Sequence, residues 1–441
     1  MKTAAAGTGQ KLYERARKLI PGGTQLLSKR PEMFLPGEWP AYYARARGAE
    51  TWDLDGNHYI DVSHSGVGAC VLGFADPDVN EAVFEAIRAG TMSTLNCPEE
   101  VELAELLLEL HPWAEMARFC RGGGEAMAMA ARIARAATGR DKIAFCGYHG
   151  WHDWYLAANL AEDHALDGHL LAGLEPAGVP RGLTGTMLPF HYNRIEELRA
   201  IVSQHGRDLA AIVMEPTRDD GPAPGFLEEI RDISSRVGAV LVFDEVTSGW
   251  RMNTGGIHRT YGVDPDMAVF AKGMGNGYAM AAVIGVRPVM ESSQTTFISS
   301  TYWTEKIGPV AALATIRKHR ARDVSKHLIA VGERVQVGWR KAADTAGLSI
   351  DVGGIAPLSH FSLPGKDGLA LLTLFTQELL ERGFLASGQF YASYAHQPHH
   401  IEAYLSAVGD VFMILSRAAA AGDVARLLRG PVKHSGFQRL T

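Results

Sequence analysis

Disulfide and metal-binding signals are nearly absent from this sequence. Its 441 residues include four cysteines, none in a CxxC pair: Cys70, Cys97, Cys120 and Cys146. Such widely spaced cysteines argue against a disulfide framework or a zinc cluster and fit a reducing compartment. We therefore expect a cytoplasmic protein in which all four thiols are buried.

Long apolar runs and clusters of one charge are also missing. No uninterrupted apolar stretch approaches the roughly 18 residues of a membrane helix. The start, MKTAAAGTGQKLYERARK, has too short an apolar stretch for a secretory signal. The 43 Lys and Arg and 49 Asp and Glu are interspersed, which disfavours a nucleic-acid groove or a polybasic patch. We expect neither nucleic acid nor membrane as a partner.

Two nucleotide-binding signatures do not occur either. No GxGxxG opens a helix, and no GxxxxGK[ST] is found, so a nicotinamide dehydrogenase or a P-loop enzyme lacks its main support. His149 and His152 stand three residues apart without a clear third ligand, and we expect no metal site there.

The hydrophobic pattern predicts a large α/β domain and a smaller one. Apolar strand-like runs alternate with helices between about residues 100 and 290, which favours a parallel sheet covered on both faces. The expected strands are 142–146, 209–214, 239–243 and 267–271. Longer amphipathic helices and short strands near 348–352 and 384–386 follow. We expect an N-terminal arm with part of the small domain (1–75), a large domain (76–320) and a C-terminal small domain (321–441).

Two local patterns give more specific expectations. Residues 51–60 alternate around Asp55-Gly56, which predicts a hairpin. Asn193 and Glu196 have the spacing of a capping box at the start of a helix that Gly206 ends.

Four features near strand ends could carry chemistry. Arg121-Gly-Gly-Gly-Glu125 leads into a helix, where a phosphate could bind, although a tight turn without ligand gives the same pattern. Asp244 follows an apolar strand and would need a cation or act as a cap. Lys272 ends another buried run, where desolvation would make its amine nucleophilic unless it reaches solvent. The segment 147–154, GYHGWHDW, could stack on a planar ring or form an aromatic corner of the core.

Together these features match the needs of one cofactor. Pyridoxal phosphate requires an aldehyde-reactive lysine, an acid facing its pyridinium nitrogen and an anchored phosphate. Lys272, Asp244 and the glycine turn could supply the three.

The chain resembles class III aminotransferases of the fold type I pyridoxal-phosphate superfamily, and within them the branch of glutamate-1-semialdehyde aminomutase. The likeness covers roughly residues 10–415 through LYERARKLIPGG, WDLDGNHYID, GYHG, MEP, FDEV, AKGMGNG and YAHQPHHIEAYL. The resemblance implies a large domain with a mostly parallel sheet covered by helices, and a smaller α/β domain from both terminal segments.

The resemblance also implies individual roles. Lys272 would form the Schiff base and move the proton, Asp244 would pair with the pyridinium nitrogen, and Glu215 would support the site. Residues implied to contact the ring or the phosphate are Val246, Tyr148, Gly123, Gly124 and Thr301, the last reaching the neighbouring subunit of a homodimer with shared sites.

Three segments depart from the family pattern. Gly122-Gly-Gly124 replaces Ser-Gly-Thr, which removes two hydroxyl contacts to the phosphate. Thr217-Arg-Asp-Asp-Gly221 replaces a Gly-Asn-rich turn and Trp303-Thr-Glu-Lys306 replaces Gly-Asn-Pro, and these two changes fall where substrate would lie. They favour a transaminase that passes an amino group from an amino acid to a ketone or aldehyde, for example a keto-sugar, in two half-reactions. Candidate substrate residues are Arg30, Arg218, Asp220 and Trp303, together with Lys29 and Arg251 for a carboxylate and Asp219 and Glu305 for a polar acceptor.

Three alternatives stay open from the sequence. The first is an aminomutase or epimerase that returns the amino group to the same molecule. The second is a binding protein that kept the fold and lost turnover, and the third is the dehydrogenase disfavoured above.

Overall fold

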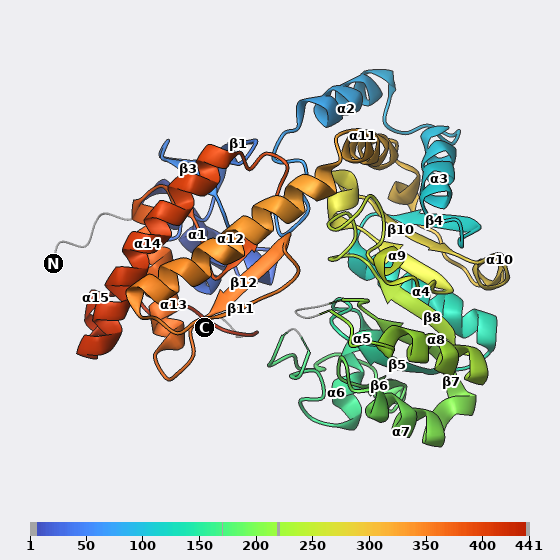
Figure 1. Cartoon of the computed structure of the whole chain (residues 1–441). Coiled ribbons are helices and arrows are strands. Elements are labelled where there is room, and N and C mark those ends of the chain that lie inside the picture. The colour runs from blue at the N-terminus through green and yellow to red at the C-terminus, as the bar shows by residue number, and fades with distance from the viewer. Residues whose placement is uncertain (1–6, 170, 218–220, 438–441) are drawn as a thin grey trace. The chain divides into compact units, whose positions relative to one another are not determined.

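The computed structural model describes residues 7–169, 171–217 and 221–437. The chain forms two compact units (Figure 1). Residues 77–326 form the larger unit, and residues 1–76 together with 327–441 form the smaller unit.

A seven-stranded sheet is the centre of the larger unit. Its order is β4-β10-β9-β8-β7-β5-β6. Only β10 runs antiparallel to its neighbours; the other recorded pairs are parallel. In sheet order the strands are Met116–Cys120, Ala281–Gly285, Met267–Phe270, Val240–Asp244, Leu209–Met214, Lys142–Cys146 and Met187–Pro189. The predicted mostly parallel sheet is confirmed.

Helices cover both faces of this sheet because its strands are apolar on both sides. Val240 and Val242 of β8 pack with α4 (Gly123–Thr138), whereas Leu241 and Phe243 pack with α8 (Phe226–Val237) on the opposite face. Side chains alternate along a strand, so the side chain of Asp244 points to the α4 face. The other helices of this unit are α2 (Pro77–Ala89), α3 (Glu99–Leu110), α5 (Asp153–Leu156), α6 (Ala158–Ala161), α7 (Ile195–His205), α9 (His258–Tyr261), α10 (Arg287–Met290) and α11 (Ile307–Ala321).

Two small sheets and long helices build the smaller unit. One sheet has the order β1-β2-β3-β13 and the other β11-β12-β14. Their strands are Tyr43–Arg47, Glu50–Asp53, His58–Asp61, Phe384–Leu385, Asp351–Gly353, Leu358–Ser362 and Gln389–Tyr391. The helices are α1 (Thr8–Leu19), α12 (Val324–Ala346, which begins in the larger unit), α13 (Gly368–Glu381), α14 (Pro398–Ala421) and α15 (Val424–Leu427).

One of these helices is long and apolar enough to cross a membrane, judged by length and composition alone. It is the 24-residue α14. Ile401, Tyr404, Val408, Val411 and Phe412 are among its buried residues, which is the pattern of a helix that packs one face against a core.

Several local expectations can be compared with the structure. The hairpin is confirmed, because β2 and β3 pair antiparallel around the Asp55-Gly56 turn with Thr51 opposite Tyr59. Strands 142–146 and 209–214 have the expected bounds. The strand expected at 348–352 is instead Asp351–Gly353.

The capping box was wrong. Asn193 takes a left-handed φ of 62° and its side-chain oxygen accepts the N–H of Ala223 at 2.8 Å, while α7 begins at Ile195. The asparagine therefore connects two loops instead of capping the helix.

The expectation of four buried cysteines was half wrong. All four are free, but Cys70 and Cys97 are partly exposed, whereas Cys120 and Cys146 are buried.

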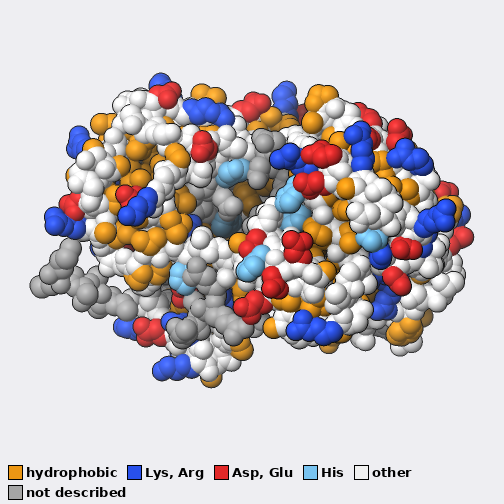
Figure 2. Space-filling view, turned by 90° about the horizontal axis from the view of Figure 1, so that it is seen from below, with side chains coloured by type: hydrophobic (Ala, Val, Ile, Leu, Met, Phe, Trp, Pro, Cys, Tyr) orange, Lys and Arg blue, Asp and Glu red, His pale blue; other side chains and the backbone are white. Residues whose placement is uncertain are grey.

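On the face shown in Figure 2, acidic and basic side chains are interspersed with apolar ones.

Candidate active site

Lys272 follows β9 at the carboxyl edge of the sheet. Its Nζ donates a hydrogen bond to Thr247 Oγ1 at 2.9 Å. Burial lowers the pKa of Lys272, and the Arg251 guanidinium lowers it further, while Glu215 and Asp244 act in the opposite direction. A lysine with a lowered pKa holds more of its amine in the neutral, nucleophilic form.

The backbone of Lys272 is in an unusual conformation. Its φ is +46°, in the left-handed region that residues with a Cβ seldom adopt. Such a conformation costs on the order of 1 kcal/mol or more and is typical of functional sites, where the surrounding structure enforces it.

Asp244 ends the neighbouring strand β8 and is 4% exposed. One carboxylate oxygen lies 2.8 Å from His149 Nδ1, and the other accepts the N–H of Val246 at 3.0 Å. His149 Nε2 lies 3.1 Å from the carbonyl oxygen of Cys146. Both ring nitrogens of His149 therefore face oxygen atoms, and the ring connects the Asp244 carboxylate to the main chain at the end of β5.

Sequence reasoning considered His149 only as a metal ligand and missed this pairing. The signal was its place in Gly147-Tyr-His-Gly, directly after a buried strand. Among the described residues, no group of three or more His, Cys, Asp or Glu is placed to hold a metal.

Glu215 follows β7 and supports the loop that begins at Gly147. Its Oε2 accepts the N–H of Tyr148 at 3.2 Å. A Cβ at Gly147 would lie 2.5 Å from this oxygen, and Gly147 has a φ of +114°. Glycine is required here because the carboxylate contacts the main chain where any side chain would begin.

The glycine turn places the start of α4 against the same strand ends. A Cβ at Gly123 would lie 3.0 Å from the Val246 side chain and 3.6 Å from that of Ala271. Glu125 closes the turn by accepting the N–H groups of Arg121 and Gly122 at 3.1 and 3.0 Å. First-turn N–H groups have no partners within a helix and form the positive end of its dipole, so this cradle suits a phosphate.

Tyr148 completes the cluster. It is partly buried and packs edge-on against Tyr155 with ring centroids 5.8 Å apart. Burial raises the pKa of Tyr148, and Asp244 and Glu215 raise it further because they lie nearby. The structure thus brings together Lys272, Asp244, Glu215, Val246, Tyr148, Gly123 and Gly124, all in the larger unit.

Other predicted site residues lie elsewhere. Thr301 and Trp303 are on a 3₁₀ turn, Thr301–Thr304, and Thr301 is exposed. Arg30 belongs to the smaller unit, where its guanidinium lies 5.8 Å from the Phe437 ring; Lys29 lies in the same unit. Arg251 is buried, with its Nε 3.3 Å from the carbonyl oxygen of Thr247. Arg218, Asp219 and Asp220 lie outside the described residues.

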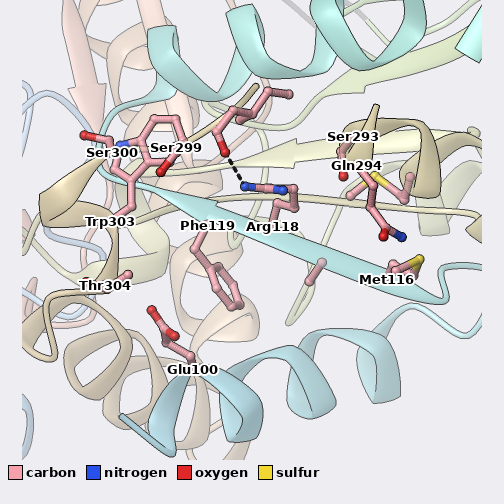
Figure 3. A pocket seen from close by; sticks show the side chains of 13 residues that line it. Glu100, Met116, Arg118, Phe119, Ser293, Gln294, Ser299, Ser300, Trp303 and Thr304 are labelled. Carbon is pink, nitrogen blue, oxygen red and sulfur yellow. Dashed lines mark hydrogen bonds between the residues drawn. The ribbon is translucent and has the colours of Figure 1, made fainter. Parts of the chain in front are cut away.

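Trp303 and Thr304 line a separate cavity of about 410 Å³ at the edge strand β4 (Figure 3). Arg118 lies along its floor and donates to the carbonyl oxygen of Ile298 at 2.7 Å. Glu100 of α3 and Phe119 of β4 also line it. Neither Lys272 nor Asp244 belongs to its lining, so the chemistry lies at the strand ends.

A family model described as "Aminotransferase class-III" matches residues 36–352. The chain belongs to the class-III aminotransferases. The 3-aminobutyryl-CoA aminotransferase of Cloacimonas acidaminovorans (strain Evry) is 33% identical over 368 residues, which are 82% of this chain and 84% of the relative. The 2'-deamino-2'-hydroxyneamine transaminase of Streptomyces kanamyceticus is 33% identical over 384 residues, 85% and 92% of the two chains.

A solved structure shows the same fold. The FumI protein of Sphingopyxis sp. MTA144, solved with pyridoxal phosphate, has a TM-score of 0.85 and 26% identity over 94% of this chain and 98% of its own. This chain, as a class-III aminotransferase, is therefore a fold type I enzyme that uses pyridoxal phosphate. The described residues fit the cofactor, since a desolvated amine, a paired carboxylate and a glycine cradle meet at one sheet edge.

Proposed function

We propose that this aminotransferase moves an amino group from an amino-acid donor to a polar ketone or aldehyde, with keto-sugars as the acceptor class to test first. The observation that supports the chemistry best is the buried arrangement of Lys272 beside Thr247, next to the Asp244–His149 pair.

Each residue has a defined task in this proposal. When bound, pyridoxal phosphate supplies a ring that accepts the electron pair released as a substrate carbon loses its proton. Lys272 holds the cofactor covalently and serves as general base and acid, for which its lowered pKa suits it. Asp244 would face the protonated ring nitrogen of the cofactor, and His149 orients the Asp244 carboxylate through their 2.8 Å contact.

Glu215, Val246 and Tyr148 position the ring in the same proposal. Glu215 fixes the loop that carries Tyr148, and Val246 packs against the start of α4, where the phosphate is held. Because Val246 and Tyr148 are both partly buried beside Asp244, they are the side chains available to hold a planar ring from its two faces.

Fewer observations support the identity of the acceptor than support the amino-transfer chemistry. Glu305, one of the polar replacements, caps α11 by accepting the N–H of Ile307 at 2.7 Å and lies 3.9 Å from Arg121. Its carboxylate is therefore engaged within the protein. The proposal of a polar acceptor rests on Arg218, Asp219 and Asp220, which lie outside the described residues.

Assignment to the glutamate-1-semialdehyde aminomutase branch also remains a proposal. The motifs GYHG, FDEV and AKGMGNG support it, whereas the changed segments 217–221 and 303–306 weigh against the aminomutase reaction itself. Both relatives named above are aminotransferases, which makes the aminomutase the less favoured alternative.

Transfer between molecules distinguishes the two reactions. We expect ¹⁵N from a labelled amino-acid donor to appear in an amine derived from an unlabelled keto-sugar or aldehyde, detected by mass spectrometry. Label that stayed on its original carbon skeleton in every mixture would support an aminomutase instead. A Lys272→Ala preparation controls for non-enzymatic exchange.

We also propose a homodimer in which Thr301 of one subunit reaches the phosphate site of the other. Beside the exposed Thr301, Phe297 and Tyr302 are 86% and 71% exposed, and a partner would cover these large apolar side chains. Sedimentation equilibrium should give twice the chain mass of 47.7 kDa. A monomer with full activity would contradict shared sites.

A further inference from the structure

The phosphate cradle has no hydroxyl side chain of its own. Positions 122–124 at the start of α4 are all glycine, so only main-chain N–H groups of this turn are available to an anion. The family pattern has hydroxyl residues at two of these positions. The question is which atoms lie where a side chain at position 124 would begin.

The ring of His152 occupies that space. A Cβ at Gly124 would lie 3.0 Å from His152 Cε1 and 3.1 Å from its Nδ1. The segment 150–152 runs directly over the helix start, because a Cβ at Gly150 would lie 3.2 Å from Gly124 Cα. The imidazole therefore lies beside the first turn of α4.

One nitrogen of this ring has no partner. His152 Nδ1 is a buried atom without a hydrogen-bond partner among the described residues. A buried polar atom without a partner destabilises the fold, so His152 Nδ1 needs an explanation such as an ordered water or a bound ligand. Burial also lowers the pKa of His152, which favours the neutral ring, and the Nδ1–H tautomer of that ring can donate from this nitrogen.

The ring is held in place from two sides. The carbonyl oxygen of His152 accepts the N–H groups of Tyr155 and Leu156 at 2.9 and 3.2 Å, which fixes its backbone at the start of α5. Its ring stacks on Trp151 with centroids 4.4 Å apart. A donor fixed in this way can bind a ligand with little loss of side-chain entropy.

We propose that His152 is a cofactor-binding residue that donates a hydrogen bond from Nδ1 to the phosphate of pyridoxal phosphate and replaces the hydroxyl missing at position 124. This inference deepens the proposed function, because it depends on the phosphate being held at the start of α4. The sequence pattern offered His152 only as a metal ligand, because only the fold places it against Gly124.

The test compares two ligands that differ only in the phosphate. Apoenzyme is titrated with pyridoxal phosphate and with pyridoxal, and binding is followed by absorbance. His152→Ala should lose about tenfold in affinity for pyridoxal phosphate, as expected for a hydrogen bond to a charged group, and stay within about twofold for pyridoxal. His152→Asn, which keeps an N–H donor near the Nδ1 position, should lose less than His152→Ala. His164→Ala, at an exposed histidine, is the matched control.

The outcomes separate the possibilities. A loss for His152→Ala that is selective for the phosphate ligand by about threefold or more supports the proposal. An equal loss for both ligands, or no loss, overturns it. If the wild-type apoenzyme bound neither ligand, the function proposed above would fail, whatever the variants did.

Exchange of the two side chains tests the shared space. Gly124→Thr alone should weaken binding of pyridoxal phosphate, because its Cβ meets the His152 ring. Gly124→Thr combined with His152→Ala should recover affinity to within about threefold of the wild type. Removal of the imidazole leaves space for the threonine side chain, whose hydroxyl can then donate to the phosphate. A double variant no better than His152→Ala would contradict the idea that the ring replaces the hydroxyl.

Discussion

Lys272→Ala is expected to lower kcat by about a thousandfold or more. The change removes the amine that holds the cofactor and moves the proton, and proton transfer alone contributes on the order of 10² to 10⁴ in rate. Steady-state transamination with a fixed donor and acceptor measures the effect. Lys272→Arg, which keeps a positive charge without a nucleophilic amine, should be nearly as inactive.

If either Lys272 variant kept activity within tenfold of the wild type, Lys272 would have no catalytic role in the reaction. The folding of each variant can be checked by unfolding the apoenzyme, because the free energy of unfolding should depend on pH through Lys272. The pKa of Lys272 is lowered from its ordinary 10.5. Between the folded pKa and 10.5, this lysine is therefore more protonated in the unfolded chain than in the folded chain. Stability therefore rises with pH between the folded pKa and 10.5.

Lys272→Met should remove this dependence. Urea unfolding of the wild-type apoenzyme between about pH 8 and about pH 10 should give a slope of the unfolding free energy that is smaller in the variant. Lys11→Met, at an exposed lysine of the smaller unit, should leave the slope unchanged. Equal slopes in all three proteins would mean that the Lys272 amine is fully hydrated.

Asp244→Asn is expected to reduce turnover by about a hundredfold to a thousandfold, the range for removing one preorganised electrostatic contact. The amide keeps the shape of the carboxylate but not the negative charge that would balance the pyridinium nitrogen of the cofactor. Pyridoxal phosphate should still bind within about tenfold of the wild-type affinity. kcat and the titrated dissociation constant of the cofactor give the two values.

A matched control is available on the same unit. Asp232 is exposed on α8, and Asp232→Asn should change neither value. Turnover of Asp244→Asn within a few-fold of the wild type would refute the role given to this carboxylate. Equal losses of cofactor binding and turnover would instead assign Asp244 to binding alone.

The strand ends of this site could be predicted from the sequence, and the contacts between them could not. Asp244 and Lys272 follow short apolar runs, and parallel strands deliver such residues to one edge of a sheet, whereas Glu215 was implied only by the family resemblance. The bonds of Lys272 to Thr247 and of Asp244 to His149 depend instead on loop conformations. No period in the sequence encodes a loop conformation.

The same distinction explains the local errors. Asn193 has the side chain of a helix cap, but its oxygen contacts Ala223, thirty residues away in the chain. Spacing alone could not indicate this tertiary contact. His152 was missed for a related reason, since its importance comes from lying over Gly124.

The antiparallel course of β10 limits how the reactive amine can move. Residues 271–280 connect β9 to β10, whose strands are paired with Ala282 opposite Phe270. The ladder of hydrogen bonds on the β9 side ends at Phe270, two residues before Lys272, so it holds the main chain close to the reactive amine. Movement of the amine between donor and acceptor then relies on rotation about the bonds of its own four-carbon side chain, whose reach sets which substrate atoms can exchange a proton.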